Sequence, residues 1–157
     1  MVKAVVTRSP EETMDAASRV AEGIGGRGFV ALIGDLGTGK TVFVKGLAKA
    51  LGVSDYRYVN SPSFVVLKEY QGKSPLYHFD IYRLESESFS ETVDYRKYFY
   101  GGGLTVVEWA DKVKDIIPDE YLEIRMFYGN SENERRIEFR AIGAKYEKAV
   151  KGIEHRA

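Results

Sequence analysis

The chain has 157 residues, a length that suits one domain with a sizeable core, and we expect residues 1–157 to form a single domain. Its 23 lysines and arginines balance 23 aspartates and glutamates, so the net charge gives no argument for tight binding to nucleic acid or membranes. The absence of cysteine excludes disulfides and thiolate chemistry, and without a signal-like or membrane-length apolar segment a cytoplasmic location is expected by default.

A short strand and a helix are predicted at the start of the chain. Residues 2–6 have the composition of a strand. Ser9, Pro10 and Glu12 then supply an N-cap serine, a first-turn proline and a capping-box glutamate, which indicate the start of a helix. Glycines between residues 23 and 28 end this helix before the next strand.

Residues 34–41 (GDLGTGKT) fit the phosphate-binding pattern G-x-x-x-x-G-K-S/T at every position. The apolar run 29–33 before them predicts a strand buried on both faces of a parallel sheet. From Lys40 onward apolar residues recur at helical spacing, and Gly52 is placed to cap that helix. A strand-to-helix loop of this kind points backbone N–H groups at one place, which predicts an anion site.

Two side chains of this loop carry the expected phosphate chemistry. The Lys40 ammonium is expected to bind the outer phosphates of a nucleotide, and the Thr41 hydroxyl to bind a magnesium ion. The alternative is a glycine-rich turn with an N-cap threonine and a solvated lysine. The strand and helix predicted on either side favour the phosphate site.

The middle of the chain is predicted to contain a loop, a pair of antiparallel strands and a helix. In the loop 60–64, Ser61 and Ser63 offer hydroxyls that either contact a terminal phosphate or bond to the local backbone. Residues 65–70 and 76–83 have the pattern of strands joined by a turn at 72–75. Residues 86–99 are mostly helical in character and end at three glycines.

Two acidic residues are candidates for phosphoryl-transfer chemistry. Glu108 ends the apolar run 104–108, at the carboxyl end of a predicted central strand, and we assign it as the metal ligand beside Thr41. Asp80 interrupts an apolar stretch, and we assign it to orienting the attacking water or supporting the metal site. These roles are exchangeable, and each acid has the alternative of being a carboxylate at the rim of the sheet. His78 receives no role, and a zinc site has no support.

The C-terminal part is predicted to hold a short helix, a hairpin and a final helix. Residues 111–117 form a short amphipathic pattern stopped by Pro118. Residues 121–127 and 136–140 alternate and are joined by the polar segment 129–133, as in a hairpin. The tail from Ala144 has helical character. The complete pattern predicts an α/β fold, a single P-loop NTPase domain whose mixed sheet has a parallel core and antiparallel hairpins and is flanked by helices.

Four motifs in this order resemble the TsaE (formerly YjeE) family. They are the loop 34–41, Asn-Ser-Pro-Ser-Phe at 60–64, Tyr-His-Phe-Asp-Ile-Tyr-Arg at 77–83 and Val-Glu-Trp at 107–109. The family consists of small bacterial P-loop ATPases needed to make threonylcarbamoyladenosine on transfer RNA. The resemblance covers nearly the whole chain, and the last two motifs are more specific than the loop.

This resemblance implies an ATPase that binds ATP and Mg²⁺ and works with the TsaB and TsaD proteins, so that tRNA is reached only through their complex. It implies that Thr41 and Glu108 bind magnesium and that Asp80 is an essential acid. The expected catalytic residues are therefore Lys40 and Asp80. It also implies Trp109 beside the nucleotide and Thr13 near the adenine. The expected nucleotide-binding residues are Thr13, Asp35, Leu36, Gly37, Thr38, Gly39, Lys40, Thr41, Val42 and Trp109.

The chain departs from the family pattern at three places, where Thr38 replaces alanine, Ser63 replaces threonine and Lys97 replaces an acid in the segment 94–99. Two other function classes are compatible with a P-loop, a small-molecule kinase and a nucleotide-dependent interaction module. The sequence lacks the arginine-rich lid segment that would be expected of a kinase. No arginine lies in a motif that places it on a terminal phosphate, so the isolated protein is expected to be a poor ATPase.

Overall fold

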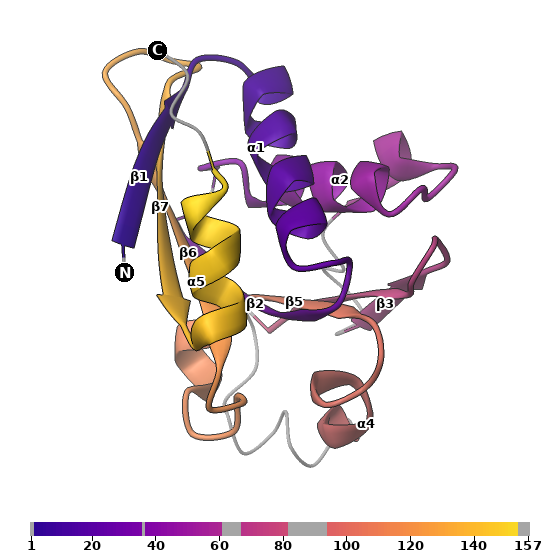
Figure 1. Ribbon diagram of the computed structural model, residues 1–157. Coiled ribbons are helices and arrows are strands. Elements are labelled where there is room, and N and C mark those ends of the chain that lie inside the picture. Colours follow the sequence, from indigo (N-terminus) through magenta and orange to yellow (C-terminus); the bar gives the residue numbers. More distant parts are fainter. Residues whose placement is uncertain (1, 36, 61–66, 82–93, 154–157) are drawn as a thin grey trace.

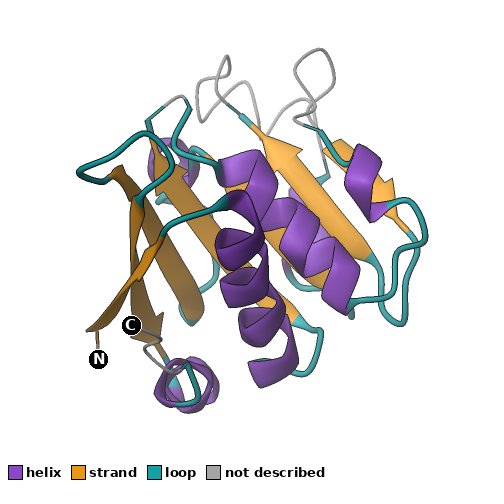
Figure 2. Cartoon of the chain, turned by 90° about the horizontal axis from the view of Figure 1, so that it is seen from above, coloured by secondary structure: helices purple, strands orange, loops and turns teal. Residues whose placement is uncertain are grey.

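The computed structural model describes residues 2–35, 37–60, 67–81 and 94–153, which form a seven-stranded mixed sheet flanked by helices (Figures 1 and 2). The strands follow the order β1-β7-β6-β2-β5-β4-β3 across the sheet. Their bounds are β1 Val2–Thr7, β2 Gly28–Gly34, β3 Leu67–Tyr70, β4 Leu76–Asp80, β5 Leu104–Glu108, β6 Tyr121–Tyr128 and β7 Arg135–Ile142. The helices are α1 Pro10–Gly23, α2 Lys40–Ala50, α4 Tyr95–Phe99 and α5 Ala144–Lys151, with 3-10 turns η1 Tyr56–Tyr58 and η2 Ala110–Val113.

The centre of the sheet is parallel and its edges are antiparallel. Strand β2 pairs in parallel with β5 and β6, and β5 pairs in parallel with β4. Strand β3 is antiparallel to β4, β7 to β6, and β1 to β7. The predicted mixed α/β sheet with a parallel core and antiparallel hairpins is therefore confirmed. Because β1 runs in the same direction as β2, Thr7 and Gly34 end at the same edge of the sheet.

The first helix and the central strand form where the sequence predicts them. The Ser9 side chain accepts a hydrogen bond from the Glu12 amide at 3.1 Å, and Pro10 occupies the first turn of α1. Residues 29–32 of β2 are all buried, as a continuous apolar run in a central parallel strand requires.

Alternate residues of the strands contribute to two cores, one on each face of the sheet. Val30 and Leu32 of β2 face the core covered by α1, α2 and α5, with α1 between the other two helices (Figure 1). Phe29 faces the opposite core, where its ring lies 4.9 Å from that of Phe99 in α4. The same alternation in β4 and β5 decides which of their side chains point toward α2.

Helices α1 and α2 approach each other closely at Gly46. A Cβ atom at this position would lie 2.4 Å from the carbonyl oxygen of Met14 and 2.6 Å from the Cβ of Ala17. The Ser18 hydroxyl donates to the Gly46 carbonyl at 3.1 Å, so the two helices also share a hydrogen bond. Only a residue without a side chain fits this crossing.

One predicted helix is not formed, and only the last part of another lies within the described residues. The helix predicted over 111–117 is wrong: the chain forms the 3-10 turn η2, followed by turns up to Pro118. This segment begins directly after Trp109, and its backbone hydrogen bonds join residues three apart, from the Lys112 amide to the Trp109 carbonyl and from the Ile116 amide to the Val113 carbonyl, both at 3.0 Å. Of the helix predicted over 86–99, α4 covers Tyr95–Phe99, and residues 82–93 lie outside the described part, as do Ser61 and Ser63.

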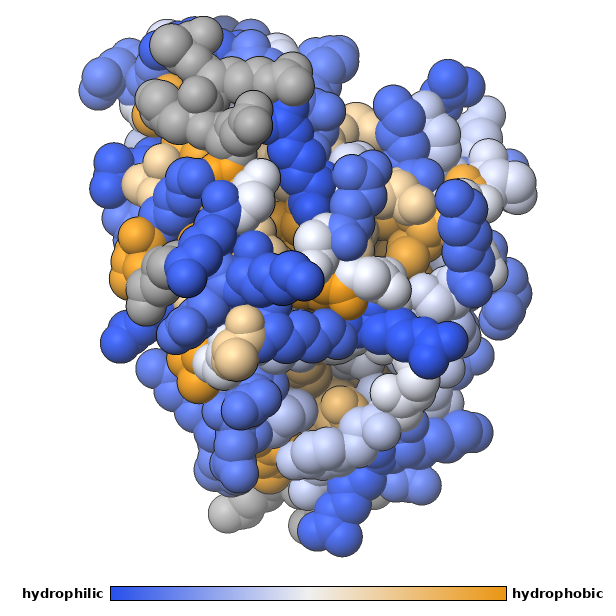
Figure 3. Space-filling model, in the orientation of Figure 1, coloured by the Kyte–Doolittle hydropathy of each residue, from blue (hydrophilic) through white to orange (hydrophobic). Residues whose placement is uncertain are grey.

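Hydrophilic side chains cover most of the face seen in Figure 3, and apolar residues form small, separate patches among them. The most exposed large apolar or aromatic side chains of the described residues are Val2, Tyr58, Tyr100, Phe127 and Tyr128. In the part of the chain that the structure describes, no helix has the length and apolar character needed to span a membrane.

Candidate functional site

The loop between β2 and α2 is shaped by two glycines in the left-handed region. Gly37 has φ 83° and Gly39 has φ 101°, values that side chains disfavour. Thr38, between them, is buried, and both its amide and its hydroxyl donate to the Asp35 carbonyl, at 3.2 and 2.7 Å. The predicted strand–loop–helix connection is present around residues 34–41, although Leu36 lies outside the described residues.

Lys40 points back into this loop. Its ammonium donates to the Gly34 carbonyl and, at 3.3 Å, to the Asp35 carbonyl, and lies 4.0 Å from the centre of the Trp109 ring. Only 6% of the residue is exposed, so the alternative of a solvated lysine does not fit. Burial lowers the pKa of Lys40 from its usual value, and the negative charges of Glu108 and Asp80 oppose that shift.

Trp109 is held over the loop by an unusual backbone. It is the one described residue other than glycine with a positive φ, and its amide donates to the Leu32 carbonyl of β2 at 3.1 Å. A bulky residue in the left-handed region costs free energy and is characteristic of functional sites. The structure thus places the ring of Trp109 on the Lys40 ammonium, although the resemblance predicts only that it lies beside a nucleotide.

The two predicted acids lie side by side at the carboxyl ends of neighbouring parallel strands. Asp80 of β4 pairs in register with Glu108 of β5. Both side chains lie on the same face as Val106, which belongs to the core under α1 and α2. Glu108 is only 2% exposed, which does not fit a carboxylate at the rim, whereas Asp80 is partly exposed. Both charges act on Lys40, so the structure brings Lys40, Asp80 and Glu108 together.

His78 is a member of this cluster to which the sequence assigns no role. Its Nε2 is hydrogen-bonded to Oε2 of Glu108, and both side chains are buried. Since a carboxylate can only accept, His78 is the donor when Glu108 is ionised. Its Nδ1 has no hydrogen-bond partner among the described residues. The available signal is its position two residues before Asp80, which puts both side chains on one strand face.

The remaining predicted residues lie around the start of α1 and α2. Thr41 and Val42 are half-buried in the first turn of α2. Thr13 is 3% exposed, and its hydroxyl shares a 2.7 Å hydrogen bond with that of Thr7. It therefore faces the contact between α1 and β1, at the same edge of the sheet as the loop. Its proximity to an adenine stays a prediction.

The groups around the loop fit a magnesium–nucleotide complex in their chemistry. Thr41 and Glu108 provide oxygen donors, which Mg²⁺ prefers. Lys40 provides a cation, and α2 begins at this residue, so its N-terminal dipole adds positive potential at the loop. Beside the loop is a pocket of about 180 Å³, lined by residues that include Gly34, Asp35 and Trp109.

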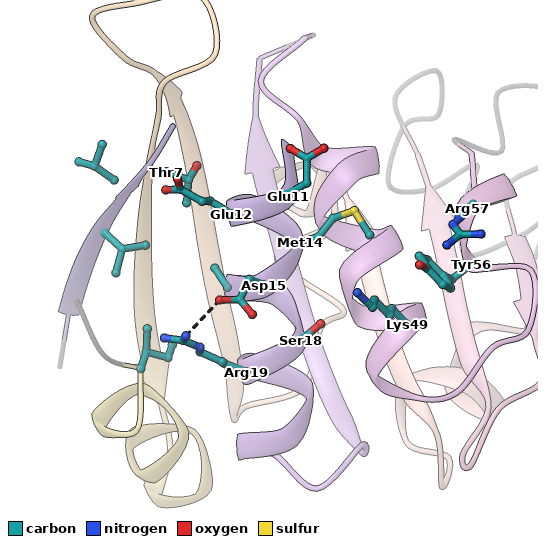
Figure 4. Close-up of a pocket in the computed structure, with 14 residues that line it drawn as sticks. Thr7, Glu11, Glu12, Met14, Asp15, Ser18, Arg19, Lys49, Tyr56 and Arg57 are labelled. Atoms are coloured by element: carbon teal, nitrogen blue, oxygen red, sulfur yellow. Dashed lines mark hydrogen bonds and ion pairs between the residues drawn. The ribbon is translucent and has the colours of Figure 1, made fainter. Parts of the chain in front are cut away.

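A larger groove of about 780 Å³ runs along α1 and contains none of the loop residues (Figure 4). On one side of α1, Asp15 and Arg19 form an ion pair of 3.0 Å near β1. On the other side, Met14 and Ser18 face Lys49 of α2 and the 3-10 turn η1. The acids and bases in its lining are mixed, so its charge points to no particular ligand.

The family model described as "Threonylcarbamoyl adenosine biosynthesis protein TsaE" matches residues 7–137, which include the loop, both acids and Trp109. The chain belongs to the TsaE family. TsaE proteins take part in tRNA threonylcarbamoyladenosine biosynthesis, and the predicted family resemblance is confirmed.

Similar TsaE proteins cover most of the chain. The TsaE protein of Bacillus subtilis is 44% identical over 142 residues, which are 90% of this chain and 87% of that protein. The TsaE protein of Aquifex aeolicus is 38% identical over 138 residues, 87% of this chain and 95% of that one. The crystal structure of Bacillus subtilis YdiB superposes with a TM-score of 0.76 at 34% identity and covers 98% of this chain and 95% of its own.

Proposed function

We propose that this TsaE-family protein binds ATP with Mg²⁺ on the loop 34–41 and hydrolyses it slowly, in an assembly with the TsaB and TsaD proteins that modifies tRNA. The observation that carries the proposal is the convergence of Lys40, Asp80 and Glu108 on one loop at the carboxyl edge of the parallel strands. Open α/β sheets bind their ligands at this edge.

Each group has a defined part in this proposal. Lys40 exchanges its two carbonyl acceptors for the outer phosphates of ATP, which supply stronger, charged acceptors. Thr41 and Glu108 would hold the magnesium ion, which neutralises negative charge on the phosphate oxygens. Asp80, partly exposed beside Glu108, accepts a hydrogen bond from the attacking water and thereby orients it.

His78 contributes to this arrangement through its hydrogen bond to Glu108. Its donated hydrogen bond holds the Glu108 carboxylate in one orientation and leaves the other carboxylate oxygen for a metal. A buried carboxylate without such a partner would be strongly destabilised. We therefore include His78 as a residue that acts through Glu108.

Incubation of the protein with γ-labelled ATP and a metabolite extract tests the proposal. Slow release of free phosphate supports an ATPase. Label transferred to a metabolite would identify a small-molecule kinase instead, and binding of ATP without turnover would identify a nucleotide-dependent interaction module. Lys40→Ala is the control that ties any activity to the loop.

A further inference from the structure

Arg135 lies against the outer side of the loop, although the sequence assigns it no role. It is the first residue of β7, where it pairs with Thr7 of β1 and with Tyr128 of β6. Strands on both sides therefore fix its backbone. This pairing places its side chain beside Gly37 and Thr38, which are remote from it in the sequence.

Among the described residues the Arg135 guanidinium has four hydrogen-bond acceptors, all of them backbone carbonyl oxygens. Two belong to the loop: Nε donates to Thr38 at 3.0 Å and one terminal nitrogen to Gly37 at 3.3 Å. The other terminal nitrogen donates to Glu132 at 2.7 Å and Glu134 at 2.9 Å, in the turn of the β6–β7 hairpin. The planar guanidinium thus joins two backbone segments, a geometry that its rigid fork of donors permits.

These bonds determine which way two peptide groups of the loop face. A trans peptide group is planar, so its N–H points opposite to its carbonyl. With the Gly37 and Thr38 carbonyls turned toward Arg135, the amides of Thr38 and Gly39 must face the inside of the loop. The Thr38 amide does so, because it donates to the same Asp35 carbonyl that the Lys40 ammonium contacts.

Neighbouring side chains support the same shape. The buried Thr38 hydroxyl donates to the Asp35 carbonyl at 2.7 Å and so closes the loop from inside. The Tyr128 hydroxyl lies against Gly37, where a Cβ atom would come within 2.7 Å of it. The Arg135 guanidinium lies over the Tyr128 ring at 5.1 Å. The loop is therefore held between Asp35 on its inner side and Arg135 with Tyr128 on its outer side.

We propose that Arg135 is a positioning residue that sets the loop in its anion-binding shape before a ligand arrives. By holding the Gly37 and Thr38 carbonyls outward, it presents the Gly39 amide to a phosphate group and lowers the ordering cost of binding. The inference rests on the proposed function for the nature of the ligand, but not for the shape of the ligand-free loop. Arg135 acts through backbone geometry and not through its charge.

The test compares Arg135→Ala and Arg135→Lys with a matched control, Arg136→Ala. Arg136 is the next residue of β7 and is exposed. Its guanidinium donates to Glu138 at 3.1 and 3.2 Å and to none of the described loop residues. Lysine keeps the positive charge at position 135 but offers a single point of attachment in place of the fork. Two quantities are measured in each: amide hydrogen exchange of residues 37–40 without ligand, and the Kd for Mg-ATP.

Within residues 37–40 we expect exchange of the Thr38 amide, which donates to the Asp35 carbonyl, to be about tenfold faster in Arg135→Ala, while amides of the central strands keep the parent's protection. The Kd for Mg-ATP should rise about tenfold, equivalent to about 1.4 kcal/mol. Arg135→Lys should show the same two changes, and Arg136→Ala should match the parent in both. Should Arg135→Ala fail to fold, Arg135→Lys provides the same readout.

Unchanged exchange at 37–40 in both Arg135 variants would overturn the inference. It would also be overturned if Arg135→Lys bound Mg-ATP as tightly as the parent, because charge alone would then suffice. If the parent itself fails to bind ATP, the proposed function fails, and the exchange measurement on the ligand-free variants still decides whether Arg135 holds the loop.

Discussion

The Lys40 ammonium is hydrogen-bonded to two carbonyls of its own loop and lies against the ring of Trp109. In the ligand-free protein the loop carbonyls thus satisfy a buried cation that would otherwise be costly. A bound phosphate would replace these carbonyls as the acceptor. In the proposed function Lys40 would therefore have two alternative sets of partners, and the competition between them would contribute to the affinity for nucleotide.

Lys40→Ala should abolish most of the ATP turnover, with a loss of at least about 100-fold, because the loop then has no cation for the developing negative charge. The fold should be retained, since the released carbonyls lie in a loop that water can reach and a charged hydrogen bond contributes only about 1.5–3 kcal/mol. Phosphate release and thermal unfolding measure the two effects. Lys49→Ala, at the exposed end of the same helix, is the control. Parental turnover in Lys40→Ala would show that the loop is not the working site.

Substitutions of Glu108 and Asp80 should affect different steps, nucleotide binding and turnover respectively. Glu108→Ala should weaken magnesium-dependent nucleotide binding, whereas Asp80→Ala should leave binding largely intact and depress turnover. Magnesium titrations with a fluorescent ATP analogue measure this difference. Because Glu108→Ala also leaves the buried His78 nitrogen without its acceptor, Glu108→Gln is the better matched variant. The reverse pattern would exchange the roles of the two acids.

Of the individual site residues, the sequence predicts those that belong to recognisable motifs. Lys40 and Thr41 follow from the loop pattern, and Glu108 follows from its place at the end of an apolar run. His78 and Arg135 have no such motif, because their roles depend on which strands become neighbours. His78 meets Glu108 only because β4 pairs with β5, and Arg135 meets the loop only because β7 lies beside β6.

Among the elements, the crossing of α1 and α2 is the contact most sensitive to a single added carbon. Replacing glycine by alanine inside a helix normally stabilises it by about 1 kcal/mol. At Gly46 we expect the opposite, a loss of about 1–3 kcal/mol, because the new methyl group would overlap the Met14 carbonyl and Ala17. Thermal and urea unfolding of Gly46→Ala measure the change.

Gly102→Ala is the matched control, because a Cβ atom there meets nothing within 4 Å. It should leave stability unchanged or slightly improved. A Gly46→Ala variant that is as stable as the parent would mean that α1 and α2 separate easily. The start of α2, and with it the loop, would then be held less rigidly than the structure indicates.

Elements with a strong periodic or apolar pattern could be predicted from the sequence, whereas their arrangement could not. The run 29–32 is buried on both faces, and the alternation in 121–127 and 136–140 corresponds to β6 and β7. The segment 111–117 has a helical pattern, but its backbone hydrogen bonds join residues three apart, so it forms a 3-10 turn and not an α-helix. The strand order depends on pairings between distant segments, which no local pattern encodes.

At the scale of the whole molecule, two arginines beside the loop, within the part of the chain that the structure describes, already have partners. Arg135 donates to loop carbonyls, and Arg125 donates to Glu123 at 2.9 and 3.2 Å. Both guanidiniums are thus bonded to groups of the protein itself, and Arg83 lies outside the described residues. An arginine supplied by a partner can accelerate nucleotide hydrolysis by about 10³–10⁵.

The isolated protein should therefore release phosphate slowly, and addition of TsaB together with TsaD should increase the rate. The measurement is phosphate release from the protein alone and with both partners. Lys40→Ala in the full mixture should stop repeated rounds of tRNA modification. Fast turnover by the isolated protein, or a rate that does not respond to the partners, would contradict this prediction.

The hydrogen bond from Arg135 to Thr38 also affects how the protein folds during translation. The two residues are 97 positions apart, and β2 pairs only with β5 and β6, which follow it by many residues. At a synthesis rate of ~5–20 residues per second, the ribosome needs roughly 5–20 s to reach Arg135 after completing the loop. For most of that interval the two strands that pair with β2 are incomplete, and until its end the nascent loop lacks the hydrogen bonds from Arg135. If ATP binds the loop in the shape that Arg135 holds, it would bind most tightly, and stabilise the protein most, only after most of the chain has been translated.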